Sequence, residues 1–149
     1  MSETTTPDRP GAMTPAVAAA FDAFPPPARD RLLDLRRLII AAADETDGVG
    51  PLTEALKWGE PAYLTEATKS GSTIRLGWKP SSPNHAAVYV NCKTTLAQTF
   101  RILFADEFTF EGERALLVDL RKPLPEAALT VCFATALTYH RAKRKPPLP

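Results

Sequence analysis

The sequence predicts an α+β fold, an antiparallel sheet of about five strands with helices packed mainly on one face. Apolar residues recur every three or four positions near both ends of the chain, which is typical of amphipathic helices. Between them lie short segments of strand-like composition, separated by Gly, Pro, Ser and Asn. Such short connections favour antiparallel neighbours. A chain of 149 residues is long enough for one domain of this kind with a single core.

Helices are predicted where apolar residues follow the helical period. In the longest of them, Leu32, Leu35 and Ile39 form one apolar stripe. Thr14 is a favourable N-cap for the first helix because its hydroxyl can accept a backbone N–H bond. A short helical turn is expected to end at Gly59, which tolerates the left-handed conformation that follows many helices. The predicted helical segments are 15–23, 28–43, 52–58, 94–104 and 125–143.

Strands are predicted at 62–66, 73–78, 86–91, 108–111 and 115–120. Because side chains alternate along a strand, Ile74 and Leu76 share one face of the sheet and Arg75 lies on the other. If the apolar residues face the helices, a set of polar and aromatic residues lines an uncovered face, which antiparallel sheets tolerate. This set consists of Arg75, Tyr89 and Asn91, joined by Tyr63.

Composition and charge predict three regions: a disordered leader (1–13), the folded domain (14–143) and a basic, proline-containing tail (144–149). The chain carries 18 Lys and Arg against 17 Asp and Glu, so its net charge of +1 creates no general field for nucleic acid or an anionic membrane. No apolar run approaches the length of a membrane helix, and the leader has no secretory pattern. We therefore expect a soluble, cytoplasmic protein of bacterial type, a monomer or a homodimer, with no nucleic-acid or membrane partner.

Two stretches carry a resemblance to a known family. One is the leucine-rich helix at 31–39, and the other is the segment 54–63, which contains Lys57-Trp58-Gly59-x-Pro61-x-Tyr63. With the strands that follow, they resemble the YdhG-like proteins (domain-of-unknown-function family 1801) over residues 15–143. The resemblance implies a compact α+β domain with a topology reminiscent of frataxin. It implies no assigned activity and supplies no catalytic residues.

The candidate ligand-binding residues are Lys57, Trp58, Tyr63, Arg75, Tyr89 and Asn91. The indole of Trp58 either covers the core or forms the wall of a pocket, in which Lys57 or Tyr63 orients a ligand. Likewise, the uncovered sheet face is either a binding surface or an ordinary solvated face with cross-strand contacts. Both pairs of alternatives stay open at the level of sequence.

The function that these residues favour is non-catalytic binding of a small molecule or a protein partner. An iron-chaperone role is the alternative, since Asp44, Glu45 and Asp47 cluster at a helix end and hard cations prefer carboxylates. His85 and Cys92 could join a metal site only if the two ends of their strand converge. No catalytic residue or cofactor is predicted, because the glycines form no phosphate-binding motif and no serine lies in a nucleophile motif. No metal site is predicted either, because the two Cys and two His residues show no metal-binding spacing. A small enzyme is a third hypothesis.

Overall fold

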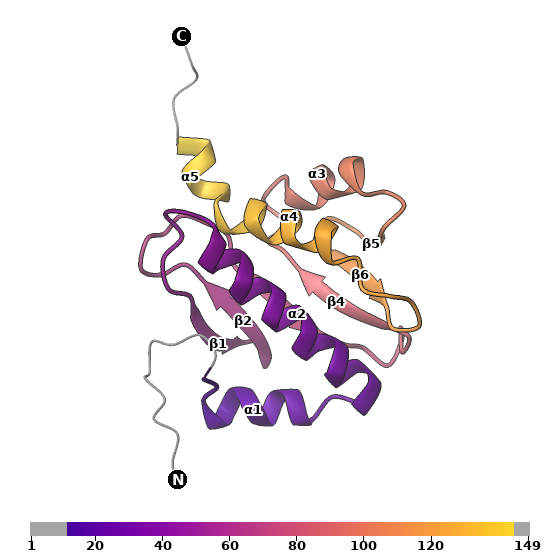
Figure 1. The fold of residues 1–149 in the computed structure, drawn as a ribbon. Coiled ribbons are helices and arrows are strands. Elements are labelled where there is room, and N and C mark those ends of the chain that lie inside the picture. Colours follow the sequence, from indigo (N-terminus) through magenta and orange to yellow (C-terminus); the bar gives the residue numbers. More distant parts are fainter. Residues whose placement is uncertain (1–11, 145–149) are drawn as a thin grey trace.

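The computed structural model of the protein describes residues 12–144, which form five helices and six strands (Figure 1). The predicted leader and tail lie almost wholly outside the described residues, although Met13 packs against the core. In chain order the elements are α1 (Pro15–Asp22), α2 (Pro26–Glu45), β1 (Thr53–Lys57), β2 (Glu60–Leu64), β3 (Ile74–Gly77), β4 (His85–Tyr89), α3 (Leu96–Leu103), β5 (Thr109–Glu111), β6 (Ala115–Asp119), α4 (Glu126–Leu137) and α5 (Tyr139–Arg144).

The strands form one sheet in the order β1-β2-β3-β4-β6-β5, and every neighbouring pair is antiparallel. The first four strands form a meander. The chain then passes through α3 to β5 at the far edge and returns through β6, which pairs with β4. The predicted α+β class and the antiparallel sheet are confirmed, with six strands in place of about five. The predicted likeness to the frataxin topology stays a prediction.

The additional strand is β1, so the helical turn predicted at 52–58 is wrong. Thr53–Lys57 pairs with β2, and the pairing of Lys57 with Glu60 leaves Trp58 and Gly59 as a two-residue turn. Both turn residues have positive φ, 56° and 77°, as a type I′ hairpin requires. The strand consists of Thr, Glu, Ala, Leu and Lys, of which four favour a helix, and pairing with β2 overrides that weak preference.

The helix predicted at 125–143 is interrupted at Thr138, where α4 ends and α5 follows. The loop between β2 and β3 takes over the carbonyl groups at the end of α4. Ser72 N donates to Ala136 O and Ser70 Oγ donates to Leu137 O, each at 2.8 Å, while Arg141 N donates to Ser70 O. These bonds replace the ones that a continuous helix would form.

The core lies between the sheet and the helices. Strand residues of one parity, among them Ile74, Leu76 and Val88, form a single buried cluster with apolar residues of α1, α2, α3 and α4. Figure 1 shows α2 and α4 side by side across this face of the sheet, which we call the inner face. At the start of α1, Val17 N donates to Thr14 Oγ1 at 3.3 Å, which confirms the predicted N-cap.

The opposite, outer face carries a second and much smaller buried cluster. It contains no helix residue and consists of Ala87, Tyr89, Ala115 and Leu117, which come from β4 and β6. The residues predicted to bind a ligand are divided between these two faces.

Candidate ligand-binding cleft

Arg75 and Tyr89 lie side by side on the outer face, because β3 and β4 pair in the register that puts these residues opposite each other. The Arg75 guanidinium carbon lies 5.0 Å from the centre of the Tyr89 ring, within the range of a cation–π contact. The prediction that Arg75 and Tyr89 lie on the same face of the sheet is confirmed. Asn91 follows Tyr89 by two positions.

Glu60 completes this group by forming an ion pair with Arg75. We call Glu60, Arg75 and Tyr89 the outer triad. Gly77 leaves room for it, since a Cβ atom there would lie 2.6 Å from Glu60 Oε2 and 2.8 Å from Tyr89 Cε2. Burial raises the pKa of Glu60, and the charge of Arg75 offsets only part of this effect. Burial also raises the pKa of Tyr89, and the nearby Glu60 carboxylate adds to the rise.

A cleft of about 400 Å³ lies on this face and gathers four of the six predicted ligand-binding residues. They come from separate segments: Lys57 and Trp58 from the β1–β2 turn, Arg75 from β3, and Asn91 from the segment after β4. Tyr89 is not among the residues that line the cleft, and it contacts the cleft through Arg75.

Sequence reasoning missed five residues that line the same cleft: Leu64, Thr73, Val90, Cys92 and Arg114. Arg114 matters most because it adds a third cation. A backbone hydrogen bond from Val90 N to Arg114 O, at 2.7 Å, holds the backbone of Arg114 beside the end of β4. Arg114 Nη2 lies 3.9 Å from Cys92 Sγ. Only the pairing of β4 with β6, which is not local in sequence, brings Arg114 to this place.

Trp58 does not cover the core. Its side chain is exposed, at 91% of the full residue area, and it stands at the tip of the β1–β2 hairpin beside the cleft. The alternative in which the indole covers the core is wrong, because the two turn residues lie beyond the last residue pair of β1 and β2 and the indole is exposed. A left-handed backbone at a residue other than glycine costs on the order of 1 kcal/mol.

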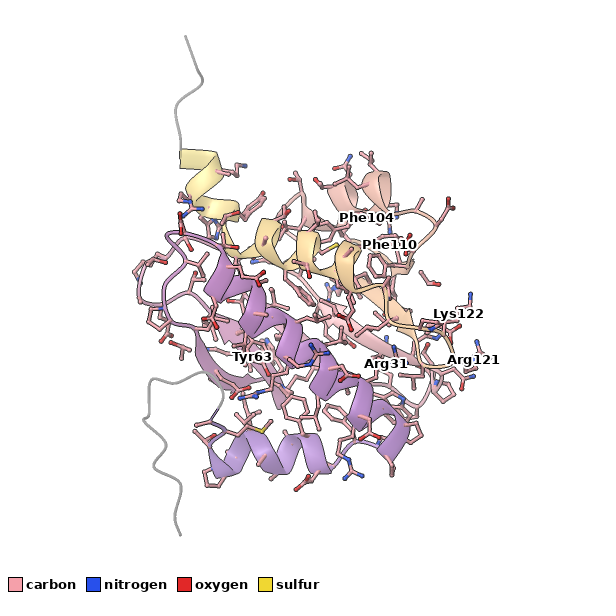
Figure 2. All side chains as sticks on the ribbon, viewed as in Figure 1. Arg31, Tyr63, Phe104, Phe110, Arg121 and Lys122 are labelled. Carbon is pink, nitrogen blue, oxygen red and sulfur yellow. The ribbon has the colours of Figure 1, made fainter. Side chains whose placement is uncertain are left out.

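Tyr63 lies on the inner face, so its predicted place on the uncovered face is wrong. It pairs with Ile74 and therefore shares the parity of the core residues. Figure 2 shows Tyr63 where α2 crosses the sheet. Its hydroxyl donates to Glu54 Oε2 at 2.7 Å, and the same carboxylate accepts from Arg36 Nε at 2.5 Å and Arg36 Nη2 at 3.0 Å.

We call Glu54, Arg36 and Tyr63 the inner triad. Burial strongly raises the pKa of the Tyr63 hydroxyl, and the Glu54 carboxylate raises it further. Burial lowers the pKa of Arg36, but the hydrogen bond to Glu54 and the charge of Glu54, together with Tyr63, outweigh burial and raise this pKa overall. This group binds α2 to the β1–β2 hairpin and is inaccessible to a ligand in the cleft.

The metal alternatives find no support in the described part of the chain. His85 begins β4, whereas Cys92 follows its other end, so the two do not converge; His85 Nδ1 lies 3.1 Å from Ser82 Oγ. Within residues 12–144, no group of three or more His, Cys, Asp or Glu side chains could hold a metal ion, and this includes the Asp44, Glu45 and Asp47 segment.

Over the same residues, no helix has both the length and the apolar character needed to span a membrane.

Comparison with known proteins adds no family to these observations. The resemblance to the YdhG-like proteins stays a prediction drawn from the residues quoted above, because no family model, no curated protein and no solved structure matches the chain.

Proposed function

We propose that the protein binds a small molecule, without catalysis, in the cleft on the outer face. The observation that carries the proposal is the convergence of Lys57, Trp58, Arg75 and Asn91 from three separate segments onto one concave surface. Its volume of about 400 Å³ falls within the usual range for small-molecule sites. The YdhG-like resemblance is compatible with such a role, since it implies no established activity.

The arrangement of the cleft supports binding through preorganisation. Arg75 is held between the Glu60 carboxylate and the Tyr89 ring, so its position is fixed before a ligand arrives. The side chains that surround it supply positive charge, hydrogen-bond donors and an indole ring, which are groups that hold a ligand in place. Residues on a rigid sheet lose little conformational entropy on binding, so more of the contact energy appears as affinity.

A protein partner is the second candidate, and the exposure of Trp58 is the observation that favours it. Tryptophan is enriched among the residues that dominate binding energy at protein interfaces. We prefer the small molecule because the cleft is concave and polar groups converge in it. The iron-chaperone alternative has no comparable observation among residues 12–144.

The test uses the two tryptophans as reporters. In Trp78→Phe only Trp58 fluoresces, and in Trp58→Phe only Trp78 does, whose Nε1 donates to Pro83 O. A thermal-shift screen of metabolites first identifies ligands, because a ligand at 100 times its Kd stabilises the native state by about 2.7 kcal/mol. Such a ligand should change the emission of Trp58 and leave that of Trp78 unchanged. A screen without any stabilising compound, or a ligand that alters only Trp78, would contradict the proposal.

A further inference from the structure

The charge of the cleft indicates which ligands it selects. Its lining includes three cations, Lys57, Arg75 and Arg114, and no carboxylate, although the whole chain has nearly as many acidic as basic residues. Arg75 is neutralised by Glu60. Within residues 12–144 neither Lys57 nor Arg114 forms an ion pair, so both charges are available to a ligand.

Hydrogen-bond donors reinforce this positive charge. Asn91 Oδ1 accepts a bond from Lys93 N at 2.8 Å, which occupies the acceptor end of the side chain and leaves its Nδ2 donor for a ligand. The Thr73 hydroxyl lines the same cleft and can also donate. Cations and N–H or O–H donors around one space are the groups that bind carboxylate and phosphate oxygens, and Arg114 can do so with two parallel bonds.

Trp58 adds a flat apolar surface at the edge of this cationic space. The hairpin keeps an exposed indole at a position with positive φ, where Asn or Gly would be less strained. A planar ring stacked on the indole would cover this apolar surface, and aromatic stacking contributes about 0.5–1.5 kcal/mol beyond the buried area.

We infer that the ligand of the cleft is a small organic anion that carries a planar ring, with its carboxylate or phosphate held by Arg114 and Lys57 and its ring on Trp58. This inference rests on the proposed binding function and names the class of ligand. Carboxylate and phosphate share the same chemistry of recognition, so the experiment must tell them apart.

The experiment compares matched pairs of probes by the fluorescence of Trp58 in the Trp78→Phe protein. The carboxylate pair is 2-naphthoate and 2-naphthamide, and the phosphate pair is AMP and adenosine; cyclohexanecarboxylate supplies an anion without a planar ring. We expect at least one aromatic anion to bind about tenfold or more tightly than its neutral partner and than cyclohexanecarboxylate. The pair with the larger ratio identifies the anionic group. Raising the salt concentration should weaken binding of the anion and leave that of the neutral partner unchanged.

Two variants separate a local charge from the overall charge of the protein. Arg114→Gln should weaken binding of the anion about tenfold while binding of the neutral partner stays the same. Lys122→Gln removes the same amount of charge at an exposed residue of the loop after β6, far from β1 (Figures 1 and 2), and should have no effect. Thermal unfolding of each variant checks that it folds like the parent protein.

Four results would overturn the inference. Equal affinity for charged and neutral partners would exclude anion selection, and so would an unchanged affinity of the anion in Arg114→Gln. Failure of both aromatic anions to bind at millimolar concentration would also overturn it, whereas the binding function itself fails if the wider metabolite screen yields no ligand or only ligands that alter Trp78 alone. Tighter binding of oligo(dT) than of AMP would assign the cleft to a nucleic-acid strand instead of a small anion.

Discussion

The two faces of the sheet carry the same three residue types in different surroundings. Each face has one glutamate that pairs with one arginine, and a tyrosine completes each group. The inner triad is Glu54, Arg36 and Tyr63, and the outer triad is Glu60, Arg75 and Tyr89. In the inner ion pair both side chains are 10% exposed, and in the outer pair they are 24% and 26% exposed.

This difference separates a structural role from a binding role. The inner triad lies under α2, and the carboxylate of Glu54 accepts two hydrogen bonds from Arg36 and one from Tyr63. Among residues 12–144, the buried cluster on the outer face contains no helix residue, and Arg75 also lines the cleft. The same chemistry therefore holds the fold together on one face and presents a positioned cation to solvent on the other.

Glu54→Ala should lower the free energy of unfolding by about 3–5 kcal/mol, because it leaves a buried arginine and a buried hydroxyl without their shared acceptor. Glu60→Ala, the matched change on the outer face, should cost about 1 kcal/mol or less, since water can solvate Arg75. Urea unfolding of both variants measures the difference. Equal losses would show that the two triads do not differ in their structural role.

Replacing a glycine by alanine should likewise cost more stability on the helix side of the sheet than on the outer face. A Cβ atom at Gly71 would lie 2.3 Å from the backbone carbonyl of Leu137, so Gly71→Ala forces α4 and the β2–β3 loop apart and should cost about 3 kcal/mol. Gly77→Ala meets only side-chain atoms of the outer triad, which can move, and should cost about 1 kcal/mol. Unfolding midpoints in urea would decide this, and a larger loss in Gly77→Ala would contradict it.

Alkaline pH should lower the free energy of unfolding, because buried groups keep their protons in the folded state and lose them in the unfolded chain. Burial raises the pKa of the Cys132 thiol from 9.0 to about 12, and it raises that of Tyr63 in the same direction. Above pH 9 the unfolded chain loses the thiol proton while the folded chain retains it, so stability is full below pH 9 and falls as pH rises toward 12. The expected slope for Cys132 alone is about 1 kcal/mol per pH unit between pH 9 and 10 and approaches about 1.4 at higher pH.

The slope of unfolding free energy against pH between 9 and 10 measures this effect. Cys132→Ala should flatten the slope, whatever its effect on the absolute stability. Cys92→Ala is the matched control, because it removes the exposed thiol and leaves the buried one in place. A slope that is identical in all three proteins would show that Cys132 does not control the alkaline limit.

Sequence reasoning succeeded where local pattern determines structure. The stripe of Leu32, Leu35 and Ile39 predicted α2, and alternation along β3 and β4 put Arg75 and Tyr89 on one face. It failed at β1 because a charged residue, Glu54, points inward there and its partner Arg36 lies in another element, so the strand has no clear apolar alternation. Arg114 and the break at Thr138 were missed for a related reason, since both depend on contacts between segments distant in the chain.

The smallest expected change in stability concerns Trp58, and its sign is the informative part. Trp58→Asn creates the Asn-Gly pair that type I′ turns prefer, and Asn tolerates positive φ better than Trp. We expect urea unfolding to show a gain of a few tenths to about 1 kcal/mol, together with loss of ligand binding in the cleft. Gly59→Ala changes the other turn residue, where φ is 77° and a Cβ atom meets nothing within 4 Å, and should lower stability while the indole and binding are retained. A Trp58→Asn protein that is less stable than the parent would mean that the indole supports the hairpin, and the case for its role in recognition would be lost.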